Sequence, residues 1–182
     1  MEEENKYDKN PVPKLTGRYI KWTAYGLLIL LFSIMQTTPH MVPSFFGALP
    51  LPLLSLTVCI AMMVGPVGGG AAGVASGLLW DLYADRLLGF NALLLLIIGC
   101  GCGLLVRLLL RNNLLSAMLL TAGALVFQGG MDWAFNYLLV VREEPVYFLL
   151  HRILPNMAYT FVITPLIYLL VYGVSHLLRR RE

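Results

Sequence analysis

Long stretches without a charged residue constrain this chain more than any other feature of its sequence. Five of them cover most of its 182 residues: Trp22 to Pro39, Met41 to Trp80, Leu87 to Val106, Asn112 to Met131 and Ile153 to Leu178. A helix that crosses a bilayer needs about 20 predominantly apolar residues. Hydrophobic residues make up 58% of the chain and charged residues only 13%, far from the balance of soluble domains. The sequence therefore predicts an all-α, polytopic integral membrane protein.

The basic residues predict which segments face the cytoplasm. Lys and Arg collect on the cytoplasmic side of membrane proteins, and here they form groups within residues 6–21, 107–111 and 179–181. Single basic residues beside acidic ones, as expected of outer loops, are Arg86, Arg142 and Arg152. For the three groups to share one side, the uncharged stretch Met41 to Trp80 must cross the membrane twice or not at all, and its forty uncharged residues favour two crossings.

This stretch contains several prolines and is too long for one span. We expect a short span near Leu51 to Val64, a tight inner turn at "GPVGGG" (residues 65–70) and a further span from about Gly69 to Tyr83. The total is six transmembrane helices with both termini cytoplasmic, in the cytoplasmic membrane. We expect residues 1–20 to be a flexible cytoplasmic tail, residues 21–178 to be one transmembrane domain and residues 179–182 to be a basic cytoplasmic tail.

Glycines recur at intervals of four in the third expected span. Gly65, Gly69, Gly73 and Gly77 are followed in the same series by Asp81. Small residues at this spacing let another helix backbone approach closely. The drift of a four-residue step around the helix favours a crossing partner over a parallel one, and the stripe can serve packing within the bundle or a dimer contact.

Asp81 is an acidic residue inside one of the most apolar parts of the chain. At 1.5 Å per residue it lies about 18 Å from Gly69, in the outer half of a hydrocarbon core about 30 Å thick. A carboxylate there is costly unless it reaches water or a polar partner. Two readings are open: Asp81 reaches the outer interface beside Trp80 and Tyr83, or it faces the bundle interior and contacts another helix.

Other polar residues are expected in the same outer half. They are Asn91 at the start of the fourth span, Asp132 and Asn136 one turn apart in the fifth, Asn156 in the sixth, and Arg152 in the adjoining loop. These residues predict a polar cluster that is either a structural hydrogen-bond network or a shallow binding cavity.

We find no pattern that indicates catalysis, a metal or a cofactor. The sequence has no P-loop, Rossmann or H-E-x-x-H motif, and no nucleophile paired with a base at a plausible depth. The three cysteines, Cys59, Cys100 and Cys102, lie inside expected spans, where disulfides are not expected. The basic end "LLRRRE" is typical of a topology signal or a contact with anionic membrane lipids rather than of nucleic-acid binding.

The segment "GVASGLLWDLYADRLLGFNALLLLIIG" (residues 73–99) carries a recognisable order of features: spaced glycines, L-x-x-D-L, a short gap, L-G, and N-A-L opening the next helix. In this order, in chain length and in span layout, the sequence resembles the rod shape-determining protein MreD family. The resemblance implies roles in helix packing and partner binding for the matching positions Gly73, Gly77, Asp81, Gly89 and Asn91.

The resemblance also implies a function. Members of that family belong to the bacterial cell-elongation machinery and work with the bitopic protein MreC, the actin-like MreB, RodA and a class B penicillin-binding protein. It implies a non-enzymatic scaffold, with a fold similar to the six-helix substrate-binding subunits of energy-coupling-factor transporters. The alternative is that the chain is itself such a vitamin-binding subunit, although the first span lacks the A-x-x-x-A docking motif usual there.

Overall fold

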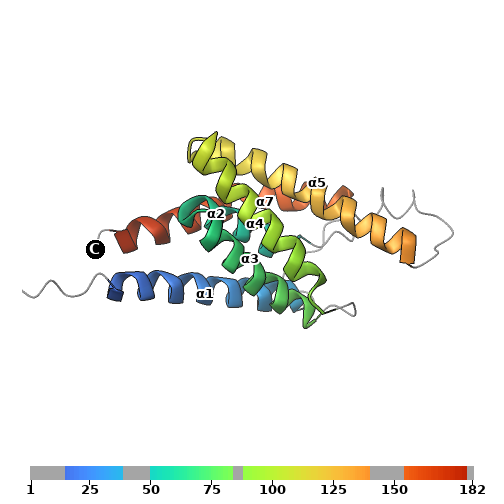
Figure 1. Cartoon of the computed structure of the whole chain (residues 1–182), viewed down its shortest axis with the longest axis horizontal. Helices are drawn as coiled ribbons and strands as arrows, with labels where there is room; N and C mark the ends of the chain where they lie inside the picture. The colour runs from blue at the N-terminus through green and yellow to red at the C-terminus, as the bar shows by residue number, and fades with distance from the viewer. Residues whose placement is uncertain (1–14, 39–49, 84–87, 140–153, 180–182) are drawn as a thin grey trace, which may run out of the picture.

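The computed structural model describes residues 15–38, 50–83, 88–139 and 154–179, and this part of the chain folds into helices only (Figure 1). In chain order, the helices are α1 (Leu15–Thr37), α2 (Pro52–Val64), α3 (Pro66–Asp81), α4 (Phe90–Leu108), α5 (Leu114–Leu139) and α7 (Leu154–Arg179). The predicted all-α class is confirmed. Helix α1 begins at Leu15, earlier than the boundary expected at residue 21, and residues 1–14 of the expected tail lie outside the described residues.

Four of these helices are long and apolar enough to cross a membrane: α1, α4, α5 and α7. Helices α2 and α3 have 13 and 16 residues, which corresponds to lengths of about 20 and 24 Å at 1.5 Å per residue. Both are shorter than a hydrocarbon core of about 30 Å. The lengths alone therefore identify four candidate spans and a shorter pair of helices between the first and second of them.

A single glycine makes the turn between α2 and α3. Gly65 has a φ of 93°, a conformation that side chains with a Cβ rarely adopt. Pro66 follows in the first turn of α3, where a missing backbone N–H is harmless. The turn expected over residues 65–70 is therefore wrong in extent, because the glycines after Pro66 are already helical.

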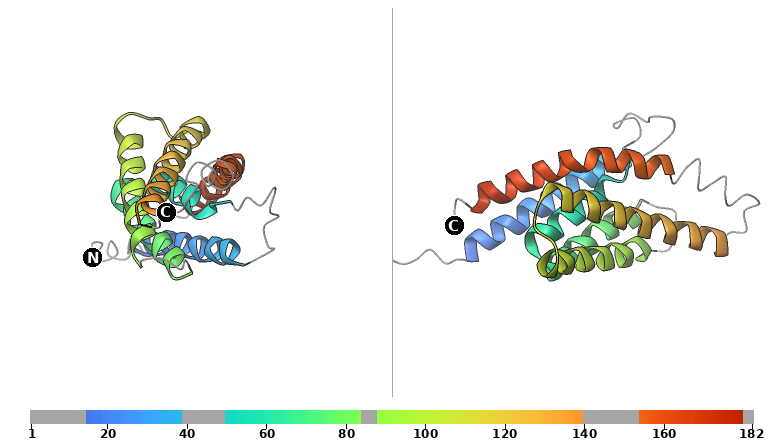
Figure 2. Two further views of the ribbon diagram at one scale, coloured as in Figure 1. Left: turned by 90° about the vertical axis from the view of Figure 1, so that its right-hand side faces the viewer. Right: turned by 90° about the horizontal axis from the view of Figure 1, so that it is seen from above.

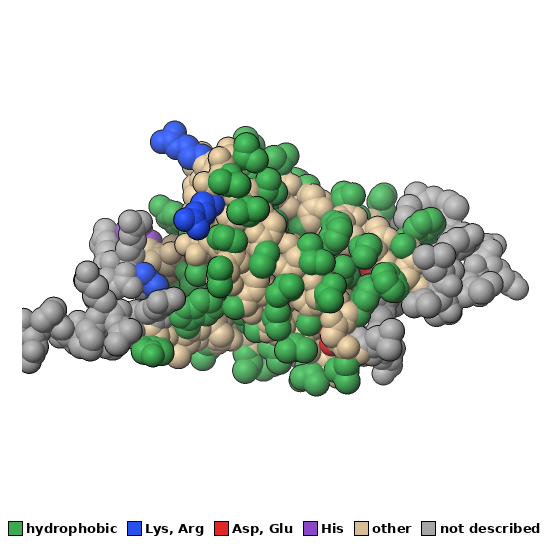
Figure 3. All heavy atoms as spheres, viewed as in Figure 1, with side chains coloured by type: hydrophobic (Ala, Val, Ile, Leu, Met, Phe, Trp, Pro, Cys, Tyr) green, Lys and Arg blue, Asp and Glu red, His purple; other side chains and the backbone are tan. Residues whose placement is uncertain are grey.

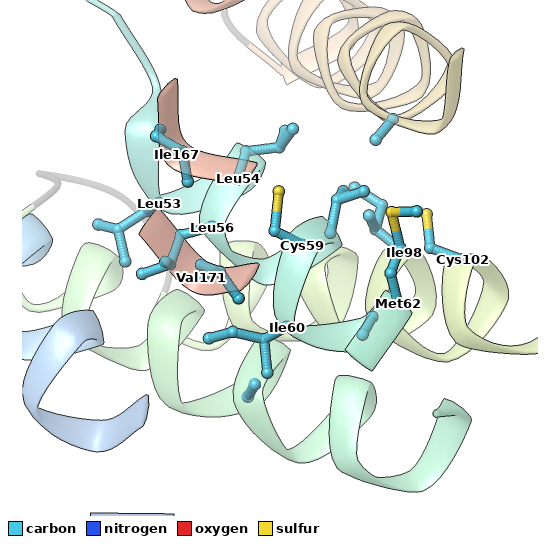
Figure 4. Packing of buried hydrophobic residues seen from close by; sticks show 14 of the residues in the cluster. Leu53, Leu54, Leu56, Cys59, Ile60, Met62, Ile98, Cys102, Ile167 and Val171 are labelled. Carbon is cyan, nitrogen blue, oxygen red and sulfur yellow. The ribbon is translucent and has the colours of Figure 1, made fainter. Parts of the chain in front are cut away.

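Helix α2 occupies the centre of the bundle. All of its residues from Pro52 to Met62 are buried, and it packs against α3, α4, α5 and α7. Figure 4 shows its side chains interleaved with Ile98 and Cys102 of α4 and with Ile167 and Val171 of α7. A helix that is apolar on every side fits a position enclosed by other helices.

The hydroxyl groups of α2 also find partners inside the bundle. Ser55 Oγ donates a hydrogen bond to Thr164 Oγ1 of α7 at 3.1 Å, and Thr57 Oγ1 lies 3.0 Å from Ser76 Oγ of α3. Because apolar burial adds little between helices in lipid, such hydrogen bonds and close packing hold the helices together.

The charged residues separate along the long axis of the molecule. Helix α1 begins and α7 ends at the same end (Figures 1 and 2). Figure 3 shows Lys and Arg side chains at this end and Asp side chains toward the other. Among the described residues, Lys21 lies near the start of α1 and Asp81 ends α3. Arg107 lies in the last turn of α4, and Arg111 lies in the connection after it.

Candidate functional site

The glycine stripe of α3 faces α4 along the whole length of the helix. A Cβ added at Gly73 would collide with the Leu95 carbonyl, and one at Gly77 with the backbone of Ala92. Gly69 and Gly99 are in mutual contact, so a Cβ on either would meet the other's carbonyl oxygen. Within this chain the stripe therefore serves packing against the next helix.

Backbone contacts between α3 and α4 extend from Gly103, which meets Gly65 and Pro66, to Ala92, which meets Gly77. Small residues on α4 (Ala92, Gly99 and Gly103) take part in these contacts, so the two antiparallel backbones stay close from the start of α3 to Gly77. The crossing partner that the four-residue spacing favours over a parallel one stays a prediction.

Asp81 lies at the far end of this stripe and is buried, with 3% of its surface exposed. Its carboxylate accepts four hydrogen bonds, all from the segment that begins α4. Oδ2 accepts from the backbone N–H groups of Gly89 at 2.9 Å and Ala92 at 3.2 Å. Oδ1 accepts from the backbone N–H of Asn91 at 3.2 Å and from its side-chain Nδ2 at 2.8 Å.

This arrangement makes Asp81 a cap for α4 supplied by the preceding helix. The first N–H groups of a helix have no partner within it, and in lipid an unpaired backbone donor costs several kcal/mol. A carboxylate at a helix N-terminus also interacts favourably with the positive end of the helix dipole. The cost of burying Asp81 is thereby offset, and α3 is fixed to the start of α4.

Two neighbouring residues complete the cap. Gly89 is the N-cap residue of α4 and has a φ of 96°, which lets the chain turn so that its own N–H points at Asp81. Asn91 is 2% exposed; its Oδ1 accepts a hydrogen bond of 3.0 Å from Gln128 Nε2 of α5. The series Asp81, Asn91, Gln128 therefore links α3, α4 and α5.

Gln128 was missed by the sequence analysis. It is 1% exposed, and its Oε1 has no hydrogen-bond partner among the described residues. An available signal was an amide deep inside the uncharged run from Asn112 to Met131, well beyond the two asparagines that open it, because polar residues at membrane depth usually have a partner. No local pattern indicates which helix supplies that partner.

The other members of the predicted outer polar cluster have different surroundings. Asp132 lies one turn after Gln128 on α5, and Asn156 lies near the start of α7; both are half-buried and engaged in interactions of their own. Asn136 is within α5, but its side chain is not described, and Arg152 lies outside the described residues. The Asp81 carboxylate accepts its four hydrogen bonds from the segment that begins α4, not from α5 or α7.

The described residues also include cysteines and other possible metal ligands. The three cysteines are free thiols, of which Cys59 and Cys102 are buried. No group of three or more His, Cys, Asp or Glu side chains in the described part of the chain could hold a metal ion. What the site does physically is to hold three helices in register through one carboxylate and two amides.

Comparison with known protein families identifies a match over most of the chain. The family model described as "rod shape-determining protein MreD" matches residues 18–179, nearly the whole chain. No curated protein and no solved structure matches the chain significantly.

Proposed function

Because the chain belongs to the MreD family, we propose that it is a non-enzymatic scaffold of the bacterial cell-elongation machinery that links MreC, the MreB cytoskeleton and peptidoglycan synthases. Membership by itself assigns the chain to rod-shape determination. The single observation that carries the proposal is the extent of the match, which includes every described helix apart from the first three residues of α1. The partners we propose are an MreC-like bitopic protein, with MreB, RodA and a class B penicillin-binding protein.

We further propose that the protein lies in the cytoplasmic membrane with six spans and both termini in the cytoplasm, in a fold like that of energy-coupling-factor substrate-binding subunits. Two observations support this topology: α1 begins and α7 ends at one end of the molecule, and Lys and Arg gather there (Figure 3). The positive-inside rule assigns such an end to the cytoplasm.

Within this scaffold, we assign a positioning role to Gly73, Gly77, Asp81, Gly89 and Asn91. The first three and Asn91 are buried against other parts of the same chain, and Gly89 forms the turn into α4. Partners would then contact the outer surface of the bundle, whose shape these residues fix, rather than the five residues themselves.

The experiment that tests the scaffold is a pull-down of the tagged full-length protein from its native membrane in mild detergent, with co-purifying proteins identified by mass spectrometry. An unrelated tagged polytopic protein from the same membrane serves as the control. We expect specific recovery of an MreC-like bitopic protein and wall synthases. Recovery of paired ATPases with a coupling membrane subunit would instead assign the chain to vitamin transport and overturn the proposal.

A further inference from the structure

An apolar groove lies between α4 and α5. It has a volume of about 500 Å³, and the residues that define it include Gly101 and Leu105 of α4, Leu109 and Leu110 after it, and Gly123 and Phe127 of α5. The two helices meet at their connection and separate away from it (Figures 1 and 2). The groove therefore opens sideways, toward the region that lipid would occupy.

Two glycines on facing helices create this space. A Cβ added at Gly101 or at Gly123 would meet no atom within 4 Å. They differ from Gly99 and Gly103 of the same "GCGCG" run, which pack against the backbone of α3. The run therefore serves two faces of α4: one closes tightly on α3, and the other leaves an opening toward α5.

The length of the groove indicates what kind of molecule fills it. Its lining extends from Ile97 on α4 to Leu110 just after it, and from Leu119 to Phe127 on α5. These intervals correspond to at most about 20 and 12 Å at 1.5 Å per residue, against a hydrocarbon core of about 30 Å. A transmembrane helix would need a groove at least about one and a half times as long, whereas the acyl chain of a lipid in one leaflet spans half of the core.

The charge at one end of the groove indicates the headgroup. Arg111 directly follows the lining residue Leu110 and is exposed. Guanidinium groups bind phosphate oxygens well, and basic residues beside grooves between membrane helices bind anionic headgroups. We propose that this groove holds one acyl chain of an anionic phospholipid whose headgroup is bound by Arg111.

Native mass spectrometry of the full-length protein tests this site. The protein in mild detergent is mixed with equal amounts of phosphatidylglycerol and phosphatidylcholine that carry the same acyl chains. We expect one phosphatidylglycerol per chain to be retained in preference to phosphatidylcholine. Arg111→Gln should reduce that preference about fivefold, since one basic side chain near an anionic headgroup is worth about 1 kcal/mol.

Gly123→Leu tests the apolar part of the same site. The new side chain enters the groove, so bound lipid of either kind should fall below a tenth of its level in the parent protein. Gly130→Leu is the matched control, because Gly130 lies on the same helix, also faces open space and does not line the groove. Equal binding of the two lipids by the parent protein, or equal retention by the two leucine variants, would overturn the proposal. So would loss of a bound protein chain from Gly123→Leu with lipid unchanged.

Discussion

At the scale of single residues, the Asp81 carboxylate gathers several hydrogen bonds on one side chain. Its four hydrogen bonds come from Gly89, Asn91 and Ala92, and three of the four donors are backbone N–H groups. Backbone donors at a helix start cannot turn away to find another partner. The network therefore depends on a side chain that can accept several bonds at once, which a carboxylate with its two oxygens does well.

Asp81→Ala leaves these donors buried without an acceptor. Each unsatisfied buried group costs about 1–3 kcal/mol, so we expect a loss of at least about 3 kcal/mol in unfolding free energy. Thermal unfolding in detergent measures the loss of stability, and complementation of cell shape at matched protein levels measures the loss of function. Asp85→Ala is the control: a surface change is usually within about 0.5 kcal/mol, and Asp85, although outside the described residues, is expected in the outer loop. Equal effects of the two changes would refute the role of Asp81.

Gln128→Met tests the other end of the network. Methionine keeps the length of the side chain but removes both amide atoms. It eliminates the buried Oε1 that has no partner among the described residues, and it removes the bond to Asn91 Oδ1. The two effects oppose each other at about 1–3 kcal/mol each, so we expect a net change below about 1 kcal/mol in chemical denaturation. A loss of more than twice that amount would mean that Oε1 has a partner and that Gln128 is central to the site.

At the scale of helices, the pair α3–α4 is held by backbone contact rather than by interlocking side chains. Gly69, Gly73 and Gly77 each bring α3 against the α4 backbone with no room for a methyl group. This close approach also places Asp81 within hydrogen-bond distance of the first turn of α4. The hydrogen bonds of Asp81 therefore depend on the close packing of the two helices, and a larger distance between α3 and α4 should break them.

Gly77→Ala is the smallest change that tests this dependence of the cap on close packing. Its Cβ would overlap the backbone of Ala92, and overpacking of this kind typically costs about 1–3 kcal/mol. Gly130→Ala, on a helix face with open space, should be neutral or stabilising by up to about 1 kcal/mol, because alanine favours helix. Melting temperatures of the two variants in the same detergent decide the matter. The larger change Gly73→Leu should prevent folding. A melting temperature of this variant near that of the parent protein would show that the glycine stripe is not needed for packing.

The elements also differ in how far the sequence could predict them. Charge-free runs located α1, α4, α5 and α7, because a span must be long and apolar. The turn at Gly65 was placed correctly but made too long, since glycine usually weakens helices and only the tertiary contact with α4 explains why the glycines after Pro66 are helical. Asp81 could be predicted to need a partner, but not which one. Gln128 was not predicted as a site residue, because no local pattern shows which side chain a buried amide will contact.

At the scale of the whole molecule, the α2–α3 pair decides how many times the chain crosses the membrane. Helix α2 is enclosed by its neighbours, so its backbone can sit at any depth without facing lipid. At about 20 and 24 Å, the two helices are shorter than the core of about 30 Å. Two arrangements fit these lengths: a crossing pair in a locally thinned bilayer, which gives six spans, or a re-entrant pair that enters and leaves on one side, which gives four.

Single cysteines labelled with a membrane-impermeant thiol reagent distinguish the two arrangements. Val67 is 85% exposed beside the Gly65 turn, so Val67→Cys reports the tip of the pair, while Asn112→Cys and Asp85→Cys report the expected inner and outer sides. If the protein has six spans, we expect Asp85→Cys to react in intact spheroplasts. Asn112→Cys and Val67→Cys should react only after lysis. Val67→Cys should react more slowly than Asn112→Cys, because the short helices leave the tip of the pair near the membrane interface. The parent chain gives the background from its own three thiols. Failure of Val67→Cys to react from either side, with Asn112→Cys reactive from the inside, would make the pair re-entrant and reduce the protein to four spans.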